Sequence, residues 1–121
     1  MKIITFFNNK GGVGKTTTVY HIAWMLKELN YQVLAVDLDP QCNLSSIFLS
    51  TERMEAIVLE EQKVTILDAI VPVSEGEPYL PVHIEKIAGN LSFLIGNLSL
   101  SAFEDTLSDA WTKCLEGAPY G

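Results

Sequence analysis

The sequence predicts an α/β fold, in which a parallel sheet is flanked by helices. Three short apolar runs, at 2–7, 33–36 and 91–95, have the length and residue types of buried strands. A glycine-rich loop and a segment of helical periodicity, 16–29, separate the first two runs. A strand, a loop, a helix and a second strand within the first 36 residues form a βαβ unit, which requires parallel strands and a right-handed crossover.

The length and composition indicate a globular chain that is one domain or part of one. The chain has 121 residues, of which 48% are hydrophobic and 19% are charged. It contains no apolar run of the roughly 18 residues that a membrane span needs. Its first apolar run is also too short for the core of a signal peptide, so we expect a cytoplasmic protein.

The charged residues and the cysteines argue against several classes of function. Residues 1–45 carry four lysines against three acidic residues, whereas 46–121 carry four basic against twelve acidic side chains. This distribution shows no basic footprint for nucleic acid. The two cysteines, Cys42 and Cys114, lack the spacing of a zinc site or a disulfide framework. We expect Cys114 to be a packing residue on a helical face.

Each element of the βαβ unit has its own sequence signal. The run 2–7 is rich in Ile and Phe, which is typical of a strand buried on both faces. In 16–29 the apolar residues recur with helical spacing along one face: Val19, Ile22, Ala23, Leu26 and Leu29. Asn30 tolerates the left-handed conformation of a helix C-cap. The second strand, 33–36, then ends at Asp37.

The signals after the second strand are weaker. A short helix is expected at 43–49, and the acidic stretch 52–62 fits no single element. Thr65 and Asp68 have the side chains of a helix N-cap. The glycine and prolines of 72–81 indicate a loop.

A third strand and a last helix complete the predicted elements. The strand 91–95 is closed by Gly96, and Ser101 with Glu104 forms a capping box. The apolar face of the helix that follows carries Phe103, Leu107, Ala110, Trp111 and Cys114. We expect the tryptophans to be core residues rather than cofactor contacts.

The glycine-rich loop, K-G-G-V-G-K-T at 10–16, has the composition and the context of a phosphate-binding loop. Its glycines, Gly11, Gly12 and Gly14, allow successive backbone N–H groups to turn toward an anion. The first N–H groups of the following helix add unpaired donors and the positive end of the helix dipole. Lys15 supplies a positive charge for the β- and γ-phosphates, and the Thr16 hydroxyl can bind Mg²⁺.

This loop departs from the usual pattern G-x-x-x-x-G-K-[ST], because Asn9 replaces the first glycine and Lys10 lies inside the loop. The variant resembles the deviant Walker A motif of the ParA/MinD superfamily of P-loop ATPases. The segment VLAVDLDPQCN, 33–43, is similar to that family's second strand and its D-x-D-P-Q switch. The likeness is strongest to the ParA/Soj type, covers 2–47 well and implies a Rossmann-like P-loop NTPase sheet.

The resemblance implies a nucleotide site for ATP or ADP. Lys15 would contact the phosphates, Thr16 would bind Mg²⁺ and Thr17 would make a further phosphate contact. Lys10 would be the family's second lysine, which reaches across a nucleotide-sandwich dimer to the phosphates of the partner subunit. The full set of nucleotide-binding residues implied is Lys10, Gly11, Gly12, Val13, Gly14, Lys15, Thr16 and Thr17.

Two aspartates complete the implied site. Asp37 would support the Mg²⁺ shell through water, and Asp39 would orient the attacking water, so that Asp39 joins Lys10 and Lys15 as the catalytic residues. Position supports the role of Asp39, because ligands of open α/β sheets bind at the carboxyl ends of the strands. Phosphoryl transfer also needs positioning more than covalent chemistry. The alternative interpretation of Asp39 is an acidic turn residue before Pro40.

The chain departs from the family pattern in two ways. Cys42 stands where relatives commonly have glycine, and we expect it to stiffen the switch without removing a catalytic group. In addition, no second acidic strand end of the Walker B kind follows within the 121 residues. We therefore interpret 1–121 as the truncated, N-terminal part of a longer ParA-like domain. We expect this piece alone to bind Mg-nucleotide weakly and to hydrolyse little ATP.

The resemblance implies a partition-type ATPase that positions a plasmid, a chromosome or other cargo by nucleotide-driven dimerisation. For the full-length protein the implied partners are a second copy, a ParB-like protein and non-specific DNA. There are three alternatives. The first is a MinD-like positioning ATPase, which needs a C-terminal amphipathic helix. The others are a metabolic relative and a non-catalytic nucleotide-binding module. The D-P-Q sequence after the second strand favours partition, and the cargo is not identified by the sequence.

Overall fold

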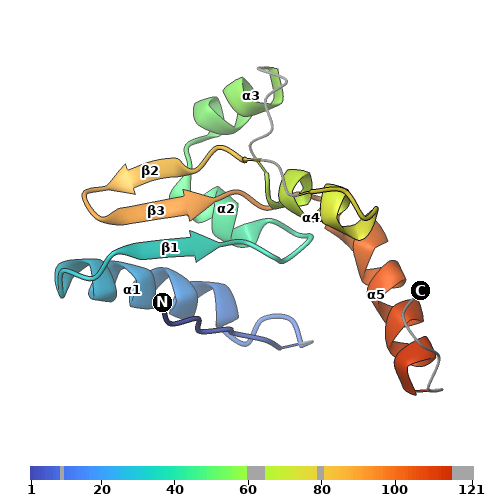
Figure 1. The fold of residues 1–121 in the computed structure, drawn as a ribbon. Helices are drawn as coiled ribbons and strands as arrows, with labels where there is room; N and C mark the ends of the chain where they lie inside the picture. The colour runs from blue at the N-terminus through green and yellow to red at the C-terminus, as the bar shows by residue number, and fades with distance from the viewer. Residues whose placement is uncertain (9, 60–64, 79–80, 116–121) are drawn as a thin grey trace.

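The computed structural model describes residues 1–8, 10–59, 65–78 and 81–115, and it confirms an α/β architecture (Figure 1). In chain order the elements are α1 Lys15–Glu28, β1 Val33–Val36, α2 Asn43–Phe48, α3 Thr51–Leu59, α4 Ile66–Ser74, β2 Glu85–Ala88, β3 Leu91–Leu94 and α5 Leu100–Leu115. Asn9 and the stretches 60–64, 79–80 and 116–121 lie outside the described residues.

The three strands form one small sheet in the order β1-β3-β2. β1 and β3 are parallel, with Val33 opposite Leu91 and Val36 opposite Leu94, as expected for strands joined by a long connection. β2 and β3 are antiparallel, with Glu85 opposite Phe93. The predicted strands at 33–36 and 91–95 are therefore confirmed. The sheet is mixed rather than wholly parallel, because β2, which was not predicted, runs antiparallel to β3.

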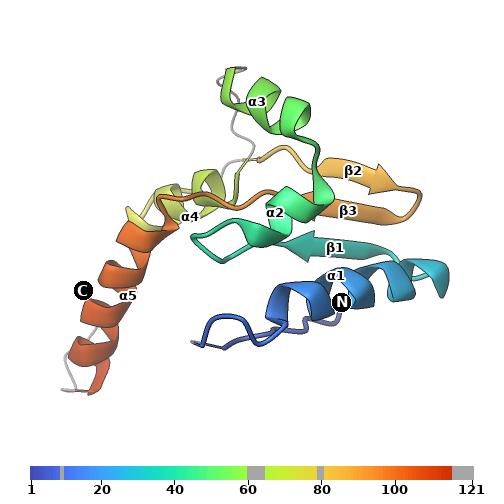
Figure 2. The same cartoon turned by 180° about the vertical axis from the view of Figure 1, so that it is seen from behind.

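The predicted strand at 2–7 is wrong for this structure. Residues 1–8 form no strand and pass along α1, on the side away from the sheet (Figures 1 and 2). Ile3 is 80% exposed and Phe7 is 87% exposed, so the run is not buried on both faces. A strand requires a neighbour whose backbone groups pair with its own, and the apolar composition of 2–7 carries no information about that neighbour.

One face of the sheet packs against α1 and α2, and this layer holds the core (Figure 2). Leu91 and Phe93 of β3 are fully buried there, and Ala35 of β1 and Ala23 of α1 join the same cluster. Leu34 points to the other face and is 49% exposed. The period-2 alternation of strand side chains explains why Leu34 and Ala35 differ so much in exposure.

The ends of α1 and α4 match the sequence signals. Leu29 is the C-cap of α1, and the next residue, Asn30, has φ 63°, the left-handed conformation expected where this helix stops. Thr65 and Asp68 form the capping box of α4, since the Asp68 carboxylate accepts hydrogen bonds from the backbone N–H and the hydroxyl of Thr65. However, α4 continues through Pro72 to Ser74, so the predicted loop begins later than 72.

The capping box predicted at Ser101 and Glu104 is wrong, because α5 already begins at Leu100. Asn97 precedes the helix, and its side-chain oxygen accepts a hydrogen bond from the backbone N–H of Ser99. Ser101 therefore lies in the first turn, where its hydroxyl donates to the carbonyl of Leu98. The side chains predicted to pack along the later turns of α5, Trp111 and Cys114 among them, lie outside what the structure describes.

In the part of the chain that the structure describes, no helix combines the length and the apolar character that a membrane crossing demands.

Gly96 follows β3 at a point of close approach to the end of β1. A Cβ atom at position 96 would lie 3.0 Å from Cγ of Asp37 and 3.1 Å from Sγ of Cys42. Both neighbouring side chains are buried. Only a residue without a side chain fits here.

We therefore expect Gly96→Ala to lower the free energy of unfolding by about 1–3 kcal/mol, the usual effect of forcing extra atoms into packed structure. Urea denaturation of the protein measures this change. Gly11→Ala is the matched control, because a Cβ at Gly11 meets nothing within 4 Å and its backbone is not left-handed. Equal stability of the Gly96→Ala variant and its parent would contradict the packing argument.

Candidate functional site

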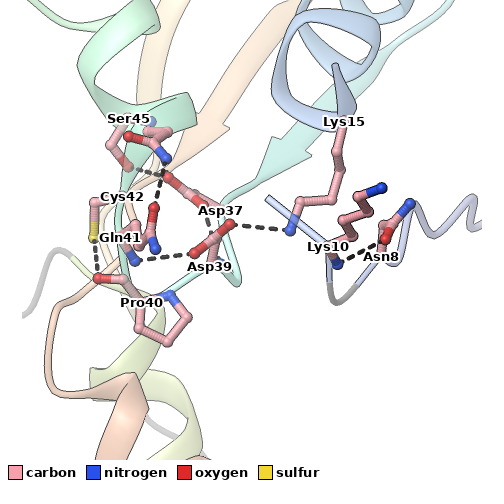
Figure 3. Close-up of polar contacts among 10 residues, drawn as sticks. Asn8, Lys10, Lys15, Asp37, Asp39, Pro40, Gln41, Cys42 and Ser45 are labelled. Carbon is pink, nitrogen blue, oxygen red and sulfur yellow. Dashed lines mark hydrogen bonds and ion pairs between the residues drawn. The ribbon is translucent and has the colours of Figure 1, made fainter. Parts of the chain in front are cut away.

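The candidate site lies where the N-terminus of α1 meets the carboxyl end of β1 (Figure 3). Lys15 is the first residue of α1, and Asp39 follows β1 by three residues. Although 24 residues separate them in the sequence, Lys15 Nζ lies 3.0 Å from Asp39 Oδ2. Their side chains are 29% and 26% exposed, so the pair is partly shielded from water.

The glycine-rich loop leads into α1 by way of two left-handed residues. Gly12 has φ 71° and Gly14, the N-cap of α1, has φ 84°, conformations that favour glycine. The carbonyl of Gly14 accepts the first helical hydrogen bond, from the N–H of Thr18 at 2.9 Å. The N–H groups of the first helical residues have no partner within the helix and point out of its N-terminus. The loop is exposed, so these donors are accessible to an anion.

Three further predicted residues lie around this helix end. Thr16 is half-buried and Thr17 is exposed, both in the first turn of α1. Val13 and Lys15 line a shallow hollow together with Phe6, which belongs to the segment before the loop. Lys15 therefore lies at the border of this hollow as well as beside Asp39.

Lys10 is not brought to the acidic side of the site. Its backbone N–H donates to Oδ1 of Asn8 at 2.8 Å, and the residue is exposed. Figure 3 shows its side chain beside Asn8 and apart from Asp39. Lys10 and Lys15 thus differ in environment, since of these two lysines it is Lys15 that forms an ion pair with Asp39.

Asp39 is oriented by its own chain as well as by Lys15. Its Oδ1 accepts the backbone N–H of Gln41 at 3.0 Å, and its own N–H donates to Oδ1 of Asp37 at 3.1 Å. The N–H of Gln41, and after it the ammonium of Lys15, hold the pKa of Asp39 below its ordinary value of 3.8, although partial burial opposes them. Asp39 is therefore a carboxylate at neutral pH.

Asp37 is 2% exposed and is held by three hydrogen bonds. Oδ1 accepts the N–H of Asp39, and Oδ2 accepts both the backbone N–H of Ser45 at 2.9 Å and its hydroxyl at 2.8 Å. Such donors are what a buried carboxylate needs in place of water. Asp37 thereby joins the end of β1 to the first turn of α2 (Figure 3).

Sequence reasoning missed Ser45. It is 0% exposed, and its hydroxyl also accepts the backbone N–H of Gly96 at 3.0 Å. A serine in a short helix carries no signal of its own. Only the fold brings it to Asp37, eight residues earlier, and to Gly96, 51 residues later.

Cys42 occupies the left-handed conformation, with φ 54°, as the N-cap of α2. This left-handed conformation favours glycine, so Cys42 adopts a backbone geometry that residues with a side chain take up at a cost. The thiol is buried and donates to the carbonyl of Pro40 at 3.6 Å. Burial, with the nearby charges of Asp37 and Asp39, raises the pKa of the thiol, so Cys42 is a neutral buried thiol at neutral pH.

The oxygen donors at the site fit the chemistry of Mg²⁺, which prefers carboxylate, hydroxyl and water oxygens. The Thr16 hydroxyl belongs to the first turn of α1, beside the loop. Both carboxylate oxygens of Asp37 already accept hydrogen bonds from the chain. Contact of Asp37 with a metal through a bound water therefore fits better than direct ligation.

Comparison with known proteins shows the family. A family model described as an AAA domain matches residues 1–115, and the chain belongs to that family. Within it, the chain is similar to P-loop proteins of the ParA/MinD type. Over 43 residues, 36% of this chain and 17% of the relative, it is 56% identical to the chromosome-partitioning ATPase Soj of Thermus thermophilus.

Two solved structures support the same assignment. A Corynebacterium diphtheriae protein is 37% identical with a TM-score of 0.78, over 92% of this chain and 40% of its own. A putative plasmid partition protein from Borrelia burgdorferi, bound to AMPPNP, is 27% identical with a TM-score of 0.57, over 79% and 38%. The chain spans less than half of the length of the curated relatives that it matches over most of its own length.

The ion pair predicts a measurable pKa change. Lys15→Met should raise the pKa of Asp39 toward 3.8 but not fully to it, because the N–H of Gln41 remains. NMR titration of the Asp39 carboxyl, without nucleotide or magnesium, measures the change. Lys10→Met removes the same charge from a residue that lies apart from Asp39, and should leave this pKa nearly unchanged.

The sign of the accompanying stability change follows from linkage. The pKa of Asp39 is lower in the folded chain than in the unfolded one, so its interactions stabilise the fold above about pH 3.8. That contribution is lost as the pH falls through the folded-state pKa. An Asp39 that titrates identically with and without Lys15 would show that the pair does not persist in solution.

Proposed function

We propose that this chain is the nucleotide-binding part of a partition-type ATPase, which binds ATP with Mg²⁺ and hydrolyses it in the full-length protein. The observation that carries the proposal is the meeting of Lys15 and Asp39, 3.0 Å apart at the junction of the glycine-rich loop and the end of β1. A cation for phosphate and a carboxylate for water then lie side by side at one place in the fold. Phosphoryl transfer needs this arrangement of charge and positioning.

Binding of the phosphates is assigned to the N-terminus of α1. The backbone N–H groups that follow Gly14 would donate to phosphate oxygens, and Thr17 would add a hydroxyl from the exposed side of the first turn. Lys15 would exchange part of its contact with Asp39 for the β- and γ-phosphates, which carry more negative charge than one carboxylate. This exchange would leave Asp39 available to a water molecule.

Hydrolysis is assigned to Asp39 together with Lys15. Asp39 would accept a hydrogen bond from the attacking water and orient it toward the γ-phosphorus. The bond from the water oxygen to phosphorus forms as the bond to the β–γ bridging oxygen breaks, and ADP leaves with that electron pair. The proton of the water passes to the released phosphate or to solvent, so ATP and water give ADP and phosphate.

Thr16, and Asp37 through a water molecule, are the residues that would hold the metal. When bound, Mg²⁺ would neutralise part of the phosphate charge during transfer. Asp37 also has a role that needs no metal, because its Oδ1 fixes the backbone of Asp39.

We assign Lys10 to a contact between subunits. It is exposed and lies apart from Asp39, which suits a side chain whose target belongs to a second copy. The family resemblance supports nucleotide-driven dimerisation as the means by which cargo is positioned, with a ParB-like protein and non-specific DNA as partners of the full-length protein. One relative is a chromosome-partitioning ATPase, and one similar structure is a putative plasmid partition protein.

Lys15→Ala should weaken ATP binding by about 1.5–3 kcal/mol, the range for a charge-assisted contact, and should abolish hydrolysis. Titration calorimetry with Mg-ATP and a phosphate-release assay on the full-length protein measure both. Lys86→Ala is the control, because Lys86 is an exposed lysine on β2. Equal ATP affinity of the Lys15→Ala variant and its parent would overturn the proposed function.

Lys10→Ala should leave ATP binding to the monomer nearly intact and abolish ATP-dependent dimers, because its target is assigned to the other subunit. Analytical ultracentrifugation of the full-length protein, with and without Mg-ATP, distinguishes the two states. Dimers of undiminished strength in this variant would refute the contact between subunits while leaving the nucleotide site in place.

A further inference from the structure

Ser45 is a polar residue whose side chain is fully buried, as are those of Phe93 and Leu91 in the core. It lies in the first turn of α2, away from the glycine-rich loop. Its side chain makes two hydrogen bonds, one donated to Asp37 Oδ2 at 2.8 Å and one accepted from the N–H of Gly96 at 3.0 Å. A single hydroxyl thus connects α2, the end of β1 and the segment after β3.

The contacts continue from Ser45 to the candidate site without a break. Oδ2 of Asp37 accepts a hydrogen bond from the Ser45 hydroxyl, and Oδ1 accepts one from the backbone N–H of Asp39. Asp39 in turn contacts Lys15 at 3.0 Å. The orientation of one carboxylate, that of Asp37, therefore links the buried serine to the turn that carries Asp39 (Figure 3).

We propose that Ser45 is a positioning residue for ATP hydrolysis, which holds the Asp37 carboxylate so that Asp39 is aimed at the attacking water. The inference rests on the proposed ATPase function and adds a residue that touches neither nucleotide nor water. Ser45 is placed to affect the chemical step and not the affinity for nucleotide, because the phosphate donors belong to α1 and its loop.

The hydroxyl is needed in addition to the backbone of Ser45. Without it, Asp37 Oδ2 would retain only the Ser45 N–H, and the N–H of Gly96 would lose its acceptor. A buried carboxylate that loses a hydrogen-bond donor either rotates toward another donor or takes up a water molecule in its place. Either movement shifts Oδ1 of Asp37, which accepts the hydrogen bond from the backbone N–H of Asp39.

Three variants of the full-length protein separate positioning from packing. Ser45→Ala removes the hydroxyl and little else, whereas Ser45→Thr retains a hydroxyl at the same carbon. Ser46→Ala is the matched control, because its hydroxyl lies one residue later in the same helix and donates to the carbonyl of Cys42 instead. Ser46 is exposed, so its loss leaves the contacts of Asp37 in place.

For Ser45→Ala we expect kcat to fall about tenfold or more, with an affinity for Mg-ATP that stays within about threefold of the parent. Ser45→Thr should recover most of the lost turnover, and Ser46→Ala should behave as the parent does. Hydrogen exchange of the Asp39 amide, measured by NMR without nucleotide, should quicken in Ser45→Ala alone. This last readout does not depend on catalysis.

Unchanged kcat in a folded Ser45→Ala variant, or an Asp39 amide that exchanges as in the parent, would overturn the inference. If Ser45→Ala does not fold, as judged by circular dichroism, Ser45→Cys replaces it, because a thiol is a much weaker hydrogen-bonding group of similar shape. Full turnover in that variant would equally overturn the role of the hydroxyl. Failure of the unmodified protein to hydrolyse ATP would overturn the proposed function itself, and this is seen before any variant is compared.

Discussion

The buried carboxylate of Asp37 is the constraint around which this site is built. A charge that is 2% exposed must find hydrogen-bond donors within the protein, and Asp37 takes them from Asp39 and from Ser45. These bonds join the end of β1 to α2, and through the Ser45 hydroxyl they reach Gly96 after β3. The chain can satisfy this one charge only when the end of β1 and α2 are correctly placed, so the charge specifies their arrangement.

The packing around Asp37 follows from the same constraint. Gly96 approaches the carboxyl carbon of Asp37 so closely that a Cβ would lie 3.0 Å from it, and the same Cβ would lie 3.1 Å from Sγ of Cys42. The backbone at Cys42 turns through a left-handed conformation, which starts α2 in the direction that brings Ser45 to the carboxylate. Small residues and a tight turn are therefore consequences of fitting backbone around a buried charge.

The two halves of the candidate site differ in burial and in hydrogen bonding, and the difference suits the proposed chemistry. The acidic half is tied into the core through Asp37, while the glycine-rich loop is exposed and is shaped by Gly12 and Gly14. An exposed loop can close its N–H groups around phosphates, and a fixed carboxylate can orient water only if it does not move with the loop. The pair of Lys15 and Asp39 connects the two halves.

The sequence by itself determined the features that depend on local interactions. The glycine-rich loop, the helix that became α1, the left-handed Asn30 after it, the strand 33–36 and the pair Thr65–Asp68 were all predicted, because each involves residues within a few positions of one another. The tertiary structure decided what depends on distant partners. It left 2–7 unpaired, added β2 beside β3, and brought Ser45 to Asp37 and Gly96. Strand pairing and the burial of a polar group are settled by which segments meet, and residue type and spacing do not encode that meeting.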